Sequence, residues 1–240
     1  MTIPFFTLCF HPSDPLTFFN YSIPNVPKID DIGDALTVMR TEFSKRNRRA
    51  RLEFIQEYNP QLVATLRPND FIEEARQCLM ICTAEKYSPV SNTSELVVEE
   101  ITEKTKVGDA QKFLAIQHTG FDGKETEAVT ETEAKHFLRM LGKGRAFVGF
   151  IEENPIAVGM FSEPHNGISE LAGLATLEAY RRQGVATAIT TLAVKRAFDQ
   201  GAEVVFLSAA DEKAGRVYQR VGFENYATVL AYIDGTESSC

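Results

Sequence analysis

The segment that restricts the fold most starts at residue 171 and ends at residue 223. Apolar runs of strand length alternate in it with helical segments bounded by turn residues. The order is strand 171–176, glycine loop 181–184, helix to about residue 198, strand 204–207 and helix 211–220. Strands that alternate with helices in this way predict an α/β fold built on a mixed sheet.

The loop before the first helix of this segment is suited to bind phosphate. Gly184 lets the backbone approach an anion without a Cβ clash. The first backbone amides of the following helix have no acceptor within it, and the helix dipole favours negative charge there. Arg181 and Arg182 precede the glycine and could donate charge-assisted hydrogen bonds to phosphate oxygens. We therefore predict that residues 182–187 form a pyrophosphate loop.

Charge and composition exclude several other classes of protein. The formal net charge of the 240-residue chain is −8, which argues against nucleic acid as the main partner. No apolar run is long enough to span a bilayer, and the N-terminal piece lacks the features of a signal peptide. The four cysteines lack paired spacing, so we expect reduced thiols, a cytoplasmic protein and no metal site.

A polar stretch containing Pro89 divides the chain, and we predict domains at residues 1–88 and 94–236. The sequence Thr130–Glu133 predicts a capping box at a helix start, and Asn154-Pro155 predicts a hairpin turn. The elements expected in the second domain before the phosphate loop are a strand at 95–101, helices at 106–117 and 131–141, a turn-rich loop at 119–128, and strands at 145–152, 156–162 and 168–176.

The first domain repeats the order of the later segment at a shift of 152 residues. Its expected elements are strands within 2–22, a helix capped by Asp30 and Asp31 that reaches residue 47 with Val38 on its apolar side, a strand at 51–56, a short helix at 60–66 and strand material at 71–82. At this shift Ile32 replaces Gly184 and Leu66 replaces Tyr218. We interpret the first domain as a degenerate copy that serves as scaffold or dimerisation element. The alternative to a duplication is that two α/β units share the same generic apolar periodicity.

Two motifs in the second domain resemble those of the GNAT superfamily of N-acetyltransferases. The family's Arg/Gln-x-x-Gly-x-Gly/Ala motif stands here as Arg181-Arg182-Gln183-Gly184-Val185-Ala186. Its Asn-x-x-Ala-x-x-hydrophobe-Tyr motif, followed by Gly-Phe, stands here from Asp211 to Tyr218, then Gly222-Phe223. Both occur in order and at the family's spacing. Asp211 departs from the usual asparagine, which puts a polar contact with pantetheine in doubt.

The resemblance implies a GNAT fold that binds acetyl-CoA as co-substrate. Backbone groups of the 174–176 strand end would pair with the pantetheine arm, and the glycine loop would hold the pyrophosphate. The residues expected to bind acetyl-CoA are Leu174, Ala175, Thr176, Arg181, Arg182, Gln183, Gly184, Val185, Ala186, Thr187, Asp211, Ala214 and Tyr218.

Two side chains are candidates for proton transfer. Tyr218 is at the family's position for a general acid, and a phenol could reprotonate the thiolate that leaves. A packed core tyrosine is the alternative. Glu170 lies on the strand where some GNAT enzymes carry a catalytic glutamate, and it could deprotonate the amine. A solvated glutamate at a strand end is the alternative.

The resemblance implies an N-acetyltransferase that moves an acetyl group directly to a primary amine of a small molecule or peptide. A CoA-binding protein without turnover is the second hypothesis, because Asp211 departs from the family pattern. Another nucleotide-binding module is the third, but the chain has neither Gly-x-x-x-x-Gly-Lys-Ser/Thr nor Gly-x-Gly-x-x-Gly. The exposed strand edges of a half-fold need covering, so we expect a pseudo-symmetric monomer or a homodimer.

Overall fold

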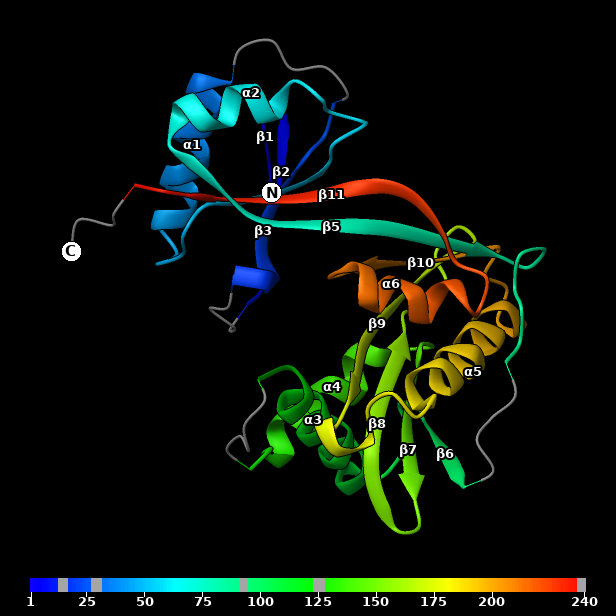
Figure 1. Cartoon of the computed structure of the whole chain (residues 1–240). Helices are drawn as coiled ribbons and strands as arrows, with labels where there is room; N and C mark the ends of the chain where they lie inside the picture. The colour runs from blue at the N-terminus through cyan, green and yellow to red at the C-terminus, as the bar shows by residue number, and fades with distance from the viewer. Residues whose placement is uncertain (13–16, 27–31, 91–94, 123–127, 237–240) are drawn as a thin grey trace. The chain divides into compact units, whose positions relative to one another are not determined.

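The computed structural model describes residues 1–12, 17–26, 32–90, 95–122 and 128–236 (Figure 1). Its chain forms two compact units. One comprises Met1–Leu79 with Tyr226–Cys240, and the other comprises Met80–Asn225. These units differ from the predicted ranges 1–88 and 94–236 mainly because the C-terminal segment belongs to the N-terminal unit.

The described residues of the N-terminal unit form strands and the helices α1 and α2. Its strands follow the order β1-β2-β3-β4-β11-β5, with β3 parallel to β4 and β11 antiparallel to β4. The elements are β1 (Thr2–Ile3), β2 (Phe6–Phe10), β3 (Asn20–Pro24), α1 (Gly33–Ser44), β4 (Arg51–Ile55), α2 (Leu62–Leu66), β5 (Phe71–Thr83) and β11 (Glu224–Asp234). Both helices bury apolar side chains in a core that includes Leu36, Phe43, Leu62 and Leu66.

Helix α1 differs from its predicted form in two ways. It ends at Ser44 rather than at residue 47, because Asn47 has a φ of +53° and cannot continue a right-handed helix. Val38 was wrongly placed on the apolar side, since its side chain is exposed while Ala35 and Met39 are buried. The predicted caps Asp30 and Asp31 lie outside the described residues.

The C-terminal unit carries the segment singled out in the sequence. Its sheet order is β10-β9-β8-β7-β6, antiparallel from β6 to β9 and parallel between β9 and β10. The elements are β6 (Leu96–Ile101), α3 (Val107–Asp122), α4 (Glu131–Leu141), β7 (Arg145–Ile151), β8 (Asn154–Phe161), β9 (Ile168–Thr176), α5 (Val185–Asp199), β10 (Val204–Ala209) and α6 (Glu212–Gln219). The predicted strands and helices are present. The first hairpin turn was wrongly placed at Asn154-Pro155, because the turn lies at residues 152–153 and Glu152 has a φ of +54°.

Helices cover both faces of this sheet. Val148 belongs to the core under α3 and α4, together with Phe113 and Leu138. The neighbouring Gly149 faces the other way, and a Cβ there would be 3.1 Å from Ile189 of α5. Because successive residues of a strand point to opposite faces, α5 lies on the face opposite α3 and α4 (Figure 1).

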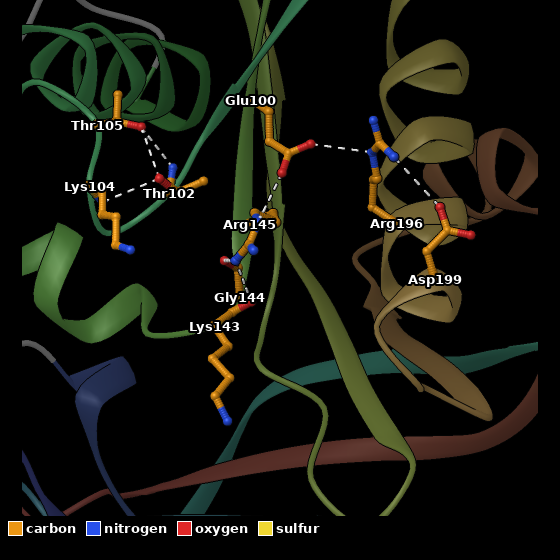
Figure 2. A network of polar contacts seen from close by, with 9 residues as sticks. All are labelled: Glu100, Thr102, Lys104, Thr105, Lys143, Gly144, Arg145, Arg196 and Asp199. Carbon is orange, nitrogen blue, oxygen red and sulfur yellow. Dashed lines mark hydrogen bonds and ion pairs between the residues drawn. The ribbon is translucent and has the colours of Figure 1, made fainter.

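An ion-pair network fixes the C-terminal end of α5 on the sheet. Glu100 of β6 accepts a hydrogen bond from Nε of Arg145 at 2.9 Å and lies 3.3 Å from Nε of Arg196 (Figure 2). Arg196, in the last turn of α5, also lies 3.7 Å from Asp199. Each exposed pair contributes about 1 kcal/mol or less, so the network orients the helix more than it stabilises the unit. The other end of α5 follows the predicted phosphate loop.

Helix α4 begins with the predicted capping box. Thr130 Oγ1 accepts from the Glu133 amide at 3.2 Å, and the Thr130 amide donates to the Glu133 carboxylate at 2.7 Å. We expect Thr130→Ala to lower the free energy of unfolding by about 1 kcal/mol, because it removes this cap. Urea denaturation measures the change, and Thr132→Ala in the same exposed first turn is the control. Equal stability of the two variants would contradict the assigned cap.

Candidate functional site

Strands β9 and β10 separate part-way along their length. Their parallel pairing runs from Ile168 with Val204 to Glu170 with Phe206. Strand β9 continues to Thr176, so residues 171–176 have no paired residue of β10 among those that the structure describes. Gly173 has a φ of +62°, and the register between β8 and β9 shifts between Val158 and Met160. The Gly173 and Thr176 carbonyls accept hydrogen bonds from the side chains of Gln117 and Arg181. Other backbone groups at such a strand edge can pair with an extended ligand.

The loop before α5 leads into backbone amides that have no acceptor within the helix. Arg182 and Gly184 have φ values of +63° and +83°, and Gly184 is the N-cap of α5. The Ala188 amide donates to the Gly184 carbonyl at 3.0 Å. The amides of Val185, Ala186 and Thr187 precede this bond and therefore have no acceptor within the helix. Left-handed turns before a helix N-terminus form a concave set of donors that suits an anion.

A pocket of about 500 Å³ lies between the free end of β9, the α5 loop and α6. This volume is typical of a small-molecule site. The predicted cofactor-binding residues that line it are Leu174, Ala175, Thr176, Arg181, Arg182, Gly184, Val185, Ala186, Thr187, Ala214 and Tyr218. Gln183 and Asp211 are not among its lining residues. The Gln183 side chain donates to the Ala179 carbonyl at 3.1 Å instead.

Asp211 has a structural task at the start of α6. Its Oδ1 accepts from the Ala214 amide at 2.8 Å, and Asp211 is the N-cap of the helix. Aspartate and asparagine cap helices about equally well, so the residue found here preserves the local structure.

Tyr218 combines a pocket position with partial burial. Its ring contacts Phe223 edge-on, with the ring centroids 5.9 Å apart. Burial, and then the Asp211 carboxylate, raise the pKa of the Tyr218 phenol above its ordinary value. The hydroxyl is therefore held as a proton donor beside the pocket.

Glu170 lies at the last paired position between β9 and β10, with an exposed side chain. Its backbone amide donates to the Ser162 hydroxyl at 2.9 Å. It is not among the pocket-lining residues, so the two catalytic candidates are not brought together in one pocket.

The family model for the acetyltransferase (GNAT) family matches residues 111–223. This range includes the open end of β9, the α5 loop and Tyr218. The chain contains a GNAT-family acetyltransferase domain. Enzymes of this family generally use acetyl-CoA, and the domain places its predicted phosphate loop and its tyrosine at one pocket. No protein of curated function matches the sequence.

Solved structures with the GNAT fold are similar to this chain. A GCN5-related N-acetyltransferase from Kribbella flavida matches with a TM-score of 0.79 and 21% identity over 97% of this chain and 87% of its own. A GCN5-related N-acetyltransferase from Sphaerobacter thermophilus matches with a TM-score of 0.65 and 11% identity, over 84% of this chain and 67% of its own. A tandem GNAT protein from the clavulanic acid biosynthesis pathway matches with a TM-score of 0.65 and 11% identity, over 91% of this chain and 76% of its own. At these identities the likeness establishes the fold.

Sequence reasoning missed several pocket residues of the GNAT domain. Lys213 and Arg216 line the pocket from α6, and Arg220 lines it from the C-cap of that helix. Gly120 and Tyr180 line it as well. The three cations are spaced along one face of α6, and this spacing could have shown that the helix adds positive charge to the phosphate loop. Gly120 could not be found in this way, because residues 119–128 were interpreted as a loop whereas α3 continues to Asp122.

The described part of the chain lacks a metal-binding cluster of side chains and a helix suited to cross a membrane. No group of three or more His, Cys, Asp or Glu side chains there could hold a metal ion. None of the described helices is long and apolar enough to cross a membrane. Cys9, Cys78 and Cys82 are free thiols, and Cys240 lies outside the described residues.

Proposed function

We propose that the chain is an acetyl-CoA-dependent N-acetyltransferase that acts on a primary amine of a small molecule or peptide. The observation that carries the proposal is one pocket lined by three features: the free edge of β9, the donor amides of the α5 loop and the Tyr218 side chain. These suit, in turn, an extended pantetheine arm, a pyrophosphate and a departing thiolate.

The proposed reaction is direct transfer within a ternary complex. The amine nitrogen attacks the thioester carbonyl carbon, the C–N bond forms and the C–S bond breaks. Tyr218 gives its phenolic proton to the leaving sulfur, and the amine loses a proton to a base. Glu170 is the proposed base, and a bridging water would be needed because its exposed side chain is not in the pocket.

The alternative of a CoA-binding protein without turnover rested on Asp211. That residue acts as the N-cap of α6 and is not among the pocket-lining residues, which weakens this support for the alternative. The test is an assay of free thiol release from acetyl-CoA with a panel of primary amines, next to a calorimetric titration. Thiol release that depends on one amine supports the proposal. Binding without release for any amine supports the alternative, and absence of binding contradicts both.

We propose further that the N-terminal unit is a degenerate copy of the GNAT fold. Elements β3-α1-β4-α2-β5 and β9-α5-β10-α6-β11 follow the same order, and α1 and α5 begin at Gly33 and Val185. The first and third elements of each set pair in parallel. At the positions of Gly184 and Tyr218 the first unit has Ile32 and Leu66, both buried in its core. A titration that gives one acetyl-CoA per chain would fit this assignment, and two would contradict it.

The acid role of Tyr218 makes a prediction about pH. A general acid acts while it is protonated, and burial, followed by the Asp211 carboxylate, raises the pKa of Tyr218 above its ordinary value. We therefore expect that the alkaline decline of kcat in the wild type lies at higher pH than the ordinary pKa of a tyrosine would give. Asp211→Asn keeps a capping side chain but removes the negative charge, so the decline should move to lower pH. Initial rates at saturating substrate concentrations across the alkaline range measure the decline of kcat in the wild type and in Asp211→Asn. A decline that does not move in Asp211→Asn would contradict the assignment to Tyr218.

A further inference from the structure

The Arg181 side chain joins two elements that the sequence did not connect. Its Nε donates to the Thr176 carbonyl of β9 at 3.0 Å, and its Nη2 donates to the Gly120 carbonyl of α3 at 3.2 Å. Both acceptors are backbone groups of pocket-lining residues. Gly120 lies in the last turn of α3, where carbonyls have no intrahelical partner and where a cation is favoured. Arg181 therefore caps the C-terminal end of α3.

The end of α3 is held tightly against β9 by two other contacts. A Cβ on Gly120 would lie 2.6 Å from the Ala175 Cβ, so only glycine permits this approach. One turn earlier, the side-chain Nε2 of Gln117 donates to the Gly173 carbonyl at 3.5 Å. Gln117, Gly120 and Arg181 thus fix α3 along residues 173–176, which include the pocket-lining end of β9.

We propose that Arg181 is a positioning residue that holds the end of α3 against β9, and that it is not a phosphate ligand. This rests on the proposed function, since it assumes that the pocket takes acetyl-CoA. The Arg181 guanidinium uses two of its N–H groups to hydrogen-bond backbone carbonyls of α3 and β9. Arg182, whose φ of +63° places it in the loop beside Gly184, remains the arginine available to the phosphates.

Lysine and alanine at position 181 separate the two roles. Arg181→Lys keeps the charge but loses the fork, while Arg181→Ala loses both. If Arg181 positions α3, both variants should speed hydrogen exchange of amides 117–122 at least about fivefold in the ligand-free protein, because the last turn of the helix loses the hydrogen bond from Arg181 to the Gly120 carbonyl and frays more often. Their Kd values for acetyl-CoA should agree within about threefold. With any amine that the wild type acetylates, kcat should fall while KM for acetyl-CoA changes little.

Gly120→Ala provides an independent variant that leaves the Arg181 charge in place. Its Cβ must displace either α3 or Ala175, so we expect the same faster exchange and the same loss of kcat as in Arg181→Ala. Arg182→Ala is the matched control, with weaker acetyl-CoA binding and unchanged exchange in α3. Circular dichroism and thermal melting show that each variant is folded.

The proposal is overturned if Arg181→Ala weakens acetyl-CoA binding, Arg181→Lys restores it and exchange in α3 stays at the wild-type rate. It is also overturned if exchange in α3 is unchanged in both variants, whatever their affinity. A wild-type protein that fails to bind acetyl-CoA contradicts the proposed function, but the exchange measurement on the ligand-free protein still tests the link between Arg181 and α3.

Discussion

Tyr218→Phe is expected to lower kcat at least tenfold while the Kd for acetyl-CoA stays within about twofold of the wild-type value. The hydroxyl that would protonate the leaving sulfur is lost. The ring that contacts Phe223 at a centroid distance of 5.9 Å is kept, so packing is preserved. Steady-state rates from free thiol release and calorimetric titration with acetyl-CoA measure the two quantities.

The control for this variant is Tyr226→Phe, which makes the same chemical change at an exposed side chain outside the pocket. Its kcat should equal that of the wild type. A kcat within twofold of the wild type in Tyr218→Phe would remove this residue from the acid role, and the phenol would then be a packed side chain at the edge of the pocket.

Gly184→Val is expected to raise the Kd for acetyl-CoA at least tenfold. Gly184 has a φ of +83°, where a residue with a Cβ is strained by roughly 1–2 kcal/mol and a β-branched residue by more. The loop relieves this strain by moving, and the donor amides of Val185, Ala186 and Thr187 lose their common direction. A loss of about 1.4 kcal/mol in binding free energy corresponds to a tenfold change in Kd.

Gly201→Val separates lost binding from lost stability. Gly201 has a φ of +91° at the C-terminal end of α5, nothing lies within 4 Å of a Cβ built there, and it is not a pocket-lining residue. The variant Gly201→Val should lower the melting temperature about as much as Gly184→Val does, but it should leave the Kd for acetyl-CoA unchanged. Equal weakening of binding by both variants would show that general destabilisation, and not the loop, controls affinity.

Local sequence pattern was sufficient for most of the C-terminal unit. Helix α5 follows from its glycine loop and apolar periodicity, and the α4 capping box follows from the spacing of Thr130 and Glu133. These features depend on residues within one or two turns of each other, so a single sequence contains the necessary information.

Features that depend on distant residues could not be predicted in this way. The pairing of β11 with β4 joins residues such as Leu230 and Phe54, and no local pattern specifies it. Gly120 looked like a turn residue, but it lies within α3. The glycine is required there because a Cβ would lie 2.6 Å from the Ala175 Cβ. The two carbonyls that bind Arg181 become neighbours only when α3 packs on β9.

A crystal structure of the wild-type protein with acetyl-CoA tests the central claim most directly. The account predicts pyrophosphate oxygens within hydrogen-bonding distance of the amides of Val185, Ala186 and Thr187, the pantetheine arm along residues 174–176, and the thioester sulfur within reach of the Tyr218 hydroxyl. Acetyl-CoA bound away from this loop, or with its sulfur remote from Tyr218, would contradict it.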